Sequence, residues 1–74
     1  MPPLPLLSGL ELIALLGRLG YATNRQRGSH VRLTCPGRAP VTVPMHDTID
    51  RGTLRSILRV TGVSVEELLA LMHR

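Results

Sequence analysis

The sequence has 74 residues, enough for one small domain, and 43% of them are apolar, which excludes a disordered chain. It has no Phe or Trp and a single Tyr, Tyr21, which argues against a binder that stacks successive bases on aromatic rings. All nine basic residues are Arg and the formal net charge is +4. Because Arg forks onto phosphate oxygens, this composition suits a nucleic-acid partner.

The single cysteine, Cys35, has no partner for an internal disulfide or a cysteine-based metal site. The acidic residues are spaced as helix caps rather than as metal ligands, so we expect no metal and no cofactor. Residues 1–7 contain three prolines and lack the basic start of a signal peptide, and we expect a loose leader there. No run approaches the roughly 20 apolar residues of a membrane span. We therefore expect one cytoplasmic domain over residues 1–74 with no membrane contact.

A first helix is predicted from about Gly9 to Leu19. Ser8 and Glu11 have the spacing of a capping box, in which a hydroxyl and a carboxylate cap the same helix start. The apolar residues that follow fall on one helical face: Leu12, Leu15, Leu16 and Leu19. Gly20 supplies the stop signal.

Three strands are predicted next, over residues 21–26, 30–35 and 41–44, with turns at 27–29 and 36–40. In the second strand, Val31, Leu33 and Cys35 alternate with His30, Arg32 and Thr34. This alternation predicts that Cys35 points into the core and that His30 lies on the opposite, accessible face. Pro44 cannot donate to a ladder, so it should lie at a strand end or a sheet edge.

Two helices close the chain. Asp50 is a good N-cap for a helix from Arg51 to Thr61, which Gly62 ends. A second capping box, at Ser64, opens a short third helix. The order predicts an α+β fold, a two-layer α-β-β-β-α domain with a short extra C-terminal helix. Double-stranded RNA binding domains have this arrangement, with one sheet face left open.

His30 is the residue best suited to chemistry. A lone His beside a Gly-containing turn is usually a solvated or capping residue. Here, Arg25, Arg27 and Arg32 are close in sequence and suit phosphates, and Gly28 lets a backbone approach a ligand. An imidazole also exchanges protons near neutral pH. It can take the proton of a ribose 2′-OH that attacks the adjacent phosphorus, or protonate the departing 5′-oxygen.

His46 follows the third predicted strand and has two interpretations. It is either a second proton-transfer group, with Asp47 beside it, or a loop residue that helps to cap the second long helix. His73 lies next to the C-terminal residue, and we expect it to be solvated.

The second long helix carries a row of like charges at every fourth residue, Arg51, Arg55 and Arg59. Residues at this spacing share one face, where like charges repel slightly. The row has two interpretations. It is a surface that contacts RNA or an acidic partner, or it is a solvent-exposed face with no partner.

Four segments resemble the HicA toxin family in the right order. The first is Gly9-x-Glu11-Leu12-Ile13 with Leu16, followed by Gly20-Tyr21, and the second is Arg25-Gln26-Arg27-Gly28-Ser29-His30, which contains the Gly-Ser-His signature. The third is Val41-Thr42-Val43-Pro44-x-His46, and the fourth is Gly52 to Arg59 followed by Gly62-Val63-Ser64. The resemblance covers nearly everything from Ser8 onward.

The resemblance implies a fold like a double-stranded RNA binding domain and a toxin that cleaves mRNA and halts translation. It implies that His30 is the catalytic histidine. The residues close to it in sequence are candidates for RNA contact: Arg25, Arg27, Gly28, Ser29 and Arg32. It also implies a HicB-like antitoxin that binds the toxin and covers its active site.

Three hypotheses are consistent with the sequence. The first is a metal-independent endoribonuclease toxin. The second is a non-catalytic RNA-binding module of the same fold, in which His30 only contacts a phosphate or a 2′-OH. The third is a degenerate toxin that persists as a partner for its antitoxin.

Overall fold

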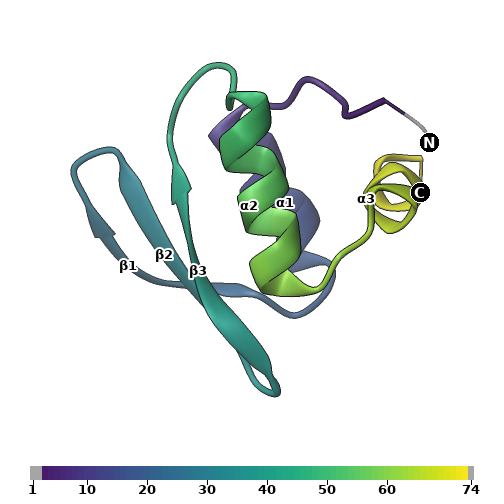
Figure 1. Ribbon diagram of the computed structural model, residues 1–74. Coiled ribbons are helices and arrows are strands. Elements are labelled where there is room, and N and C mark those ends of the chain that lie inside the picture. The colour runs from purple at the N-terminus through teal and green to yellow at the C-terminus, as the bar shows by residue number, and fades with distance from the viewer. Residues whose placement is uncertain (1–2, 74) are drawn as a thin grey trace.

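The computed structural model describes residues 3–73 and contains a helix, three antiparallel strands and two further helices (Figure 1). In chain order these are α1 (Gly9–Gly17), β1 (Ala22–Arg27), β2 (His30–Cys35), β3 (Arg38–Pro44), α2 (Arg51–Thr61) and α3 (Val65–Met72). The predicted α+β class and the α-β-β-β-α order are confirmed, and α3 is the extra C-terminal helix.

The strands form one sheet in the order β1-β2-β3. The alternation of β2 divides its residues as predicted, because Val31 and Leu33 are buried while His30 and Arg32 are exposed. In β3, Val41 and Val43 pair with Leu33 and Val31 and are also buried. The helices cover this aliphatic face, and α2 lies beside β3 while α1 lies behind α2 in the view of Figure 1. The opposite sheet face is left open.

Strand β1 extends beyond the helical layer. All six of its residues are exposed, so neither of its faces contributes to the core. The strand is held through its ladder with β2, whose register shifts between Thr23 and Arg25. A shift of this kind is a β-bulge, which increases twist and protects an edge strand from further pairing. The β1–β2 hairpin is therefore a twisted arm at the side of the domain (Figure 1).

The helix starts agree with the predicted caps, and some element ends differ. Helix α1 ends at Gly17 rather than at Leu19, because the amides of residues 18–20 bond to carbonyls three residues back, in a tighter turn. Strand β3 begins at Arg38 rather than Val41, so only Pro36 and Gly37 remain in the turn. Pro40 fits inside β3 because this strand is at the edge of the sheet.

The predicted loose leader is wrong at its C-terminal end. Leu7 is only 3% exposed and belongs to the core, and Leu4 packs against it. The carbonyl of Leu7 also accepts a hydrogen bond from the amide of Ile49 (2.8 Å). Three prolines exclude a helix here but do not prevent an extended segment from burying a leucine. Residues 1 and 2 lie outside the described residues.

Helix α3 packs against α1 and is hydrogen-bonded to the C-terminal end of α1. Leu68 and Leu71 are buried, and the Arg18 guanidinium donates to the carbonyl of Leu71 near the end of α3. None of the helices within residues 3–73 is long and apolar enough to cross a membrane.

Gly9 brings the start of α1 against the end of β3. Its amide donates to the carbonyl of His46 (2.9 Å), and a Cβ built on it would overlap the Pro44 carbonyl and lie 2.9 Å from Met45 Cα. This contact fixes α1 to the segment that leaves the sheet.

Replacing Gly9 by Ala should therefore destabilise the fold by about 1–3 kcal/mol through overpacking. The matched control is Gly17→Ala, because nothing lies within 4 Å of a Cβ there. That change should stabilise α1 by about 0.5 kcal/mol. Urea denaturation of both variants measures the difference. Equal effects of the two substitutions would contradict the close approach at Gly9.

The start of α2 depends on an ionised carboxylate. Asp50 accepts from the Thr53 amide (3.1 Å) and the Thr53 hydroxyl (2.6 Å), and these bonds lower the pKa of its carboxyl. In the first capping box the Ser8 amide likewise donates to the Glu11 carboxylate (2.9 Å), and this hydrogen bond lowers the pKa of that carboxyl.

A carboxyl with a lowered folded-state pKa contributes stability above its unfolded-state pKa and loses it as the pH falls through the folded value. The unfolding free energy of the wild type should therefore fall below about pH 4. Asp50→Asn keeps a capping side chain but removes this ionisation, so its stability should fall less steeply over the same range. Denaturation curves between neutral and acid pH measure both slopes. Identical slopes would show that Asp50 ionisation does not support α2.

Candidate functional site

The β1–β2 connection is a two-residue turn, Gly28-Ser29, between the paired residues Arg27 and His30. Gly28 has a φ of 59° and no described residue other than Gly has a positive φ. A positive φ at the first central residue alone matches a type II′ turn, whose twist suits an antiparallel hairpin. Nothing lies within 4 Å of a Cβ built on Gly28, so the turn conformation by itself accounts for this glycine.

The register of this hairpin collects the predicted basic residues on one face. Directly opposed residues in an antiparallel ladder point to the same side of the sheet. Arg27 is opposite His30 and Arg25 is opposite Arg32. On the other side of β2, Thr42 of β3 is opposite Arg32. These five side chains therefore share the open face.

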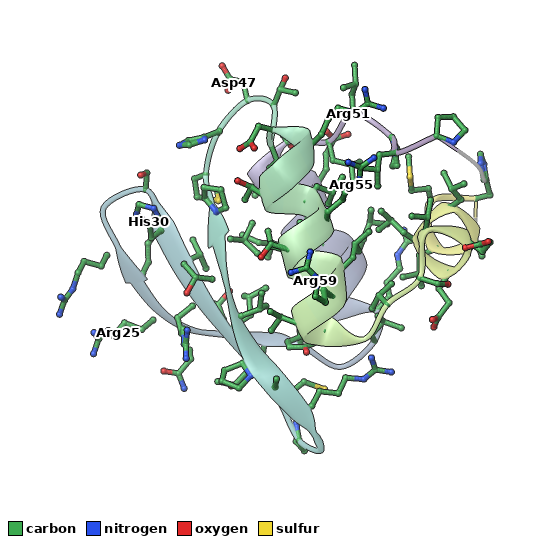
Figure 2. The ribbon with its side chains drawn as sticks, in the orientation of Figure 1. Arg25, His30, Asp47, Arg51, Arg55 and Arg59 are labelled. Atoms are coloured by element: carbon green, nitrogen blue, oxygen red, sulfur yellow. The ribbon has the colours of Figure 1, made fainter. Side chains whose placement is uncertain are left out.

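A shallow hollow of about 490 Å³ lies on this face, which we call the arginine hollow. It is lined by residues of all three strands: Asn24, Arg25, Arg27, His30, Arg32 and Thr42. Figure 2 shows His30 and Arg25 on the hairpin, well apart from the helices. Three guanidinium groups and one imidazole thus surround a space open to solvent.

The arginine side chains of the hollow differ in how they are held. Arg32 Nη1 donates to Thr42 Oγ1 (3.1 Å), which orients that guanidinium across the β2–β3 ladder. No hydrogen bond within the described residues involves the side chains of Arg25, Arg27 or His30. These three groups are free to contact a bound anion, since a guanidinium fork matches phosphate oxygens.

The structure places the predicted site residues in two groups. His30, Arg25, Arg27 and Arg32 line the hollow, whereas Gly28 and Ser29 form the turn at its end. The Ser29 carbonyl accepts from the amide of Met45 (2.6 Å), which ties the turn to the chain leaving β3.

His46 is exposed and does not line the arginine hollow. Its neighbour Met45 is bonded to Ser29, so the His46 backbone is close to the hairpin turn. The His46 carbonyl accepts a hydrogen bond from the amide of Gly9 at the start of α1, and the N-cap of α2 is Asp50. The predicted role of His46 as a cap for α2 is therefore wrong. Asp47 points away from His30, at the outer end of the β3–α2 connection (Figure 2).

Sequence reasoning missed two lining residues, Asn24 and Thr42. Thr42 carried a usable signal, because it lies between Val41 and Val43 and must face away from the core. Asn24 lies at the β-bulge between Thr23 and Arg25, and a bulge breaks the alternation on which such reasoning depends.

The row Arg51, Arg55 and Arg59 follows α2, and all three residues are exposed (Figure 2). We call it the α2 arginine row. With about 100° between successive helix residues, Arg51 and Arg55 lie on the side of α2 opposite Val60. None of the three lines the arginine hollow. The arginine hollow and the α2 arginine row are therefore separate cationic surfaces.

Cys35 is half-buried and packs against the core, with its thiol 3.8 Å from the carbonyl of Leu19. Burial of this side chain is thus partial rather than complete, in agreement with its place beside the register shift at the end of β2. His73 is exposed at the end of α3, as expected. Over residues 3–73 no group of three or more His, Cys, Asp or Glu side chains is arranged to hold a metal ion.

The comparisons with known proteins give one match. The family model described as HicA toxin of bacterial toxin-antitoxin systems matches residues 9–63, which is most of the chain. The chain belongs to the HicA toxin family. No curated protein and no solved structure is significantly similar to it.

As a HicA-family member, the chain is the toxin of a toxin–antitoxin system and has an antitoxin as its partner. The matched range includes α1, all three strands and α2, and therefore every residue of the arginine hollow. Helix α3 lies beyond it.

Proposed function

We propose that this HicA-family toxin is a metal-independent endoribonuclease that cleaves mRNA in the cytoplasm and so inhibits translation. The observation that supports this most directly is the placement of His30 in a hollow lined by Arg25, Arg27 and Arg32. A cationic hollow attracts a phosphodiester backbone, and an imidazole beside it supplies proton transfer near neutral pH. RNA provides its own nucleophile for such a site.

In the proposed reaction the ribose 2′-oxygen attacks the adjacent phosphorus, and the bond to the 5′-oxygen of the next nucleotide breaks. If His30 is the general base, it accepts the 2′-hydroxyl proton, and a second group or water protonates the leaving 5′-oxygen. If His30 is the general acid, it protonates the leaving 5′-oxygen, and a second group or water accepts the 2′-hydroxyl proton. The products are a 2′,3′-cyclic phosphate and a 5′-hydroxyl end. DNA is not a substrate because it lacks the 2′-hydroxyl.

The arginines have a separate part in this proposal. Negative charge on the phosphate oxygens increases as the new bond forms, and fixed cationic donors stabilise that charge. Arg32 is the best placed, since its bond to Thr42 already holds the guanidinium in position. Arg25 and Arg27, both on β1, bind neighbouring phosphates of the RNA. The Gly28-Ser29 turn keeps β1 and β2 in register, so these arginines stay opposite Arg32 and His30.

His46 is the candidate for the second proton-transfer group. The observation that supports this role is the hydrogen bond from the Met45 amide to the Ser29 carbonyl. This bond brings the His46 backbone close to the turn that precedes His30. Its side chain is exposed and approaches a substrate only once RNA spans the turn and the β3–α2 connection.

We expect the wild type to cleave single-stranded RNA in EDTA, and His30→Ala to reduce the rate by at least about a hundredfold, as for loss of a general acid or base. Arg55→Ala is a control of similar exposure outside the hollow and should keep the wild-type rate. His46→Ala tests the second group and should lower the rate by a similar factor without weakening binding.

The outcome also decides among the alternatives. RNA binding without cleavage in both wild type and His30→Ala would indicate a non-catalytic RNA-binding module. Neither binding nor cleavage, with antitoxin binding retained, would indicate a degenerate toxin.

The two cationic surfaces are expected to bind different partners. A strand in the arginine hollow does not reach Arg51 and Arg55, because they lie on the far side of α2. We propose that the α2 arginine row, Arg51, Arg55 and Arg59, contacts the HicB-like antitoxin.

Two double variants that remove equal charge test this division. Arg25→Ala with Arg27→Ala should reduce the salt slope of single-stranded RNA binding by about 1.4, because each lost phosphate contact contributes about 0.7. Arg51→Ala with Arg55→Ala should leave the slope unchanged and weaken antitoxin binding. Binding isotherms at several salt concentrations measure the slopes. Equal slopes for the two double variants would contradict the assignment of RNA to the hollow.

A further inference from the structure

A second hollow, of about 330 Å³, adjoins the arginine hollow and lies between β3 and α2. Arg32 and Thr42 line both hollows and form the boundary between them. Its volume is within the range of pockets that hold small ligands, about 300–1,000 Å³. We call it the β3–α2 hollow.

The lining of the β3–α2 hollow differs from that of its neighbour. Its floor is aliphatic, since Val41 and Ile57 contribute and are only 4% and 3% exposed. One wall is the face of α2 formed by Thr53, Ser56 and Val60, at the helical spacing of three and four residues. Apart from Arg32 at the boundary, no charged side chain lines it. An apolar floor with hydroxyls around it suits a flat, apolar group with polar edges.

Val60 extends the apolar lining of the β3–α2 hollow to the surface of the molecule. It is a large aliphatic side chain that is 45% exposed in the last turns of α2. The burial pattern of α2 does not require it, since the buried residues are on a neighbouring face: Leu54, Ile57, Leu58 and Thr61. Together with Ile57 and Val41 it extends the apolar surface out of the core and up to the boundary with the arginine hollow.

We infer that the β3–α2 hollow binds one unpaired nucleobase of the RNA strand whose phosphates occupy the arginine hollow. This rests on the proposed function and adds a binding subsite for one base that is turned out of the stack of the RNA strand. In a duplex the base edges are paired and stacked, so a base enters a recess between a strand and a helix only when it is unpaired. Arg32, held by Thr42, contacts the phosphate that joins the two hollows.

The sequence composition agrees with a single recess rather than a stacking platform. The only aromatic ring, Tyr21, is buried with its hydroxyl bonded to the carbonyl of Ala39 (2.8 Å), and is not available for a base. The base is instead held by aliphatic contacts to Val60 and Ile57, with its polar edge toward the Ser56 hydroxyl. The Thr53 hydroxyl donates to Asp50 and is left to accept a hydrogen bond.

The test uses two uncleavable ligands of equal length and charge. One is a mixed-sequence single-stranded RNA with 2′-fluoro groups in place of the 2′-hydroxyls, and the other is its abasic counterpart. The wild type should bind the ligand with bases about tenfold more tightly, as expected for one apolar contact surface on a base.

The variant Ser56→Leu fills the hollow without changing charge, and leucine is a good helix former. It should reduce the preference for bases to about twofold while leaving the affinity for the abasic ligand unchanged. Val60→Ala removes apolar lining instead of filling the hollow, and it should also reduce the preference for the ligand with bases over the abasic ligand. Ala70→Leu, exposed on α3, is the matched control and should keep the wild-type preference.

The possible failures are distinct. A wild type that binds both ligands equally, or a Ser56→Leu variant that keeps the full preference, overturns the inference and leaves the proposed nuclease intact. Weaker antitoxin binding by Ser56→Leu with unchanged RNA preference also overturns it and assigns the hollow to the antitoxin. Absence of RNA binding by the wild type overturns the proposed function and the inference together.

Discussion

The register of the central strand β2 is the constraint on which the rest of this molecule depends. Side chains alternate along a strand, so a slip of one residue would turn Val31 and Leu33 to solvent and His30 and Arg32 into the core. The aliphatic face of β2 and β3 packs beneath α1 and α2 and excludes that slip. The Gly28-Ser29 turn fixes the same register from the hairpin side, since Arg27 must be opposite His30. The burial that stabilises the fold therefore also presents His30 and Arg32 to solvent.

Much of this followed from the sequence, for physical reasons. The alternation of β2 predicted the exposure of His30, because period two is unambiguous in a strand with one buried face. Asp50, Ser8 and Ser64 predicted the helix starts, because caps are local interactions. The three-helix, three-strand order followed from these two signals.

Other features were beyond sequence reasoning, because they depend on tertiary contacts. Leu7 is buried against core residues far away in sequence, and its carbonyl accepts a hydrogen bond from the amide of Ile49. The β-bulge at Asn24 leaves no signature in a strand whose residues are all exposed. The β3–α2 hollow is formed by two elements whose separation is set by packing, and neither element alone shows it. The roles assigned to His30 and its neighbours stay predictions until activity is measured.

Under the proposed function, the arrangement accounts for how a small chain binds two partners. The open sheet face carries His30 and the arginines that suit RNA, and the outer side of α2 carries a second set of arginines suited to an acidic antitoxin surface. Thin stability margins are expected at this size, yet the core is continuous from Leu7 through the sheet to α3. A functional face that adds nothing to the core tolerates a high density of like charge.

The chemistry of the cleaved ends tests the central claim most directly. If His30 promotes attack by the 2′-hydroxyl, mass spectrometry of the products should find 2′,3′-cyclic phosphate and 5′-hydroxyl ends. A single 2′-deoxy substitution at the cleaved nucleotide should then abolish cleavage there. Products with 3′-hydroxyl and 5′-phosphate ends, or unchanged cleavage of the 2′-deoxy substrate, would contradict this account.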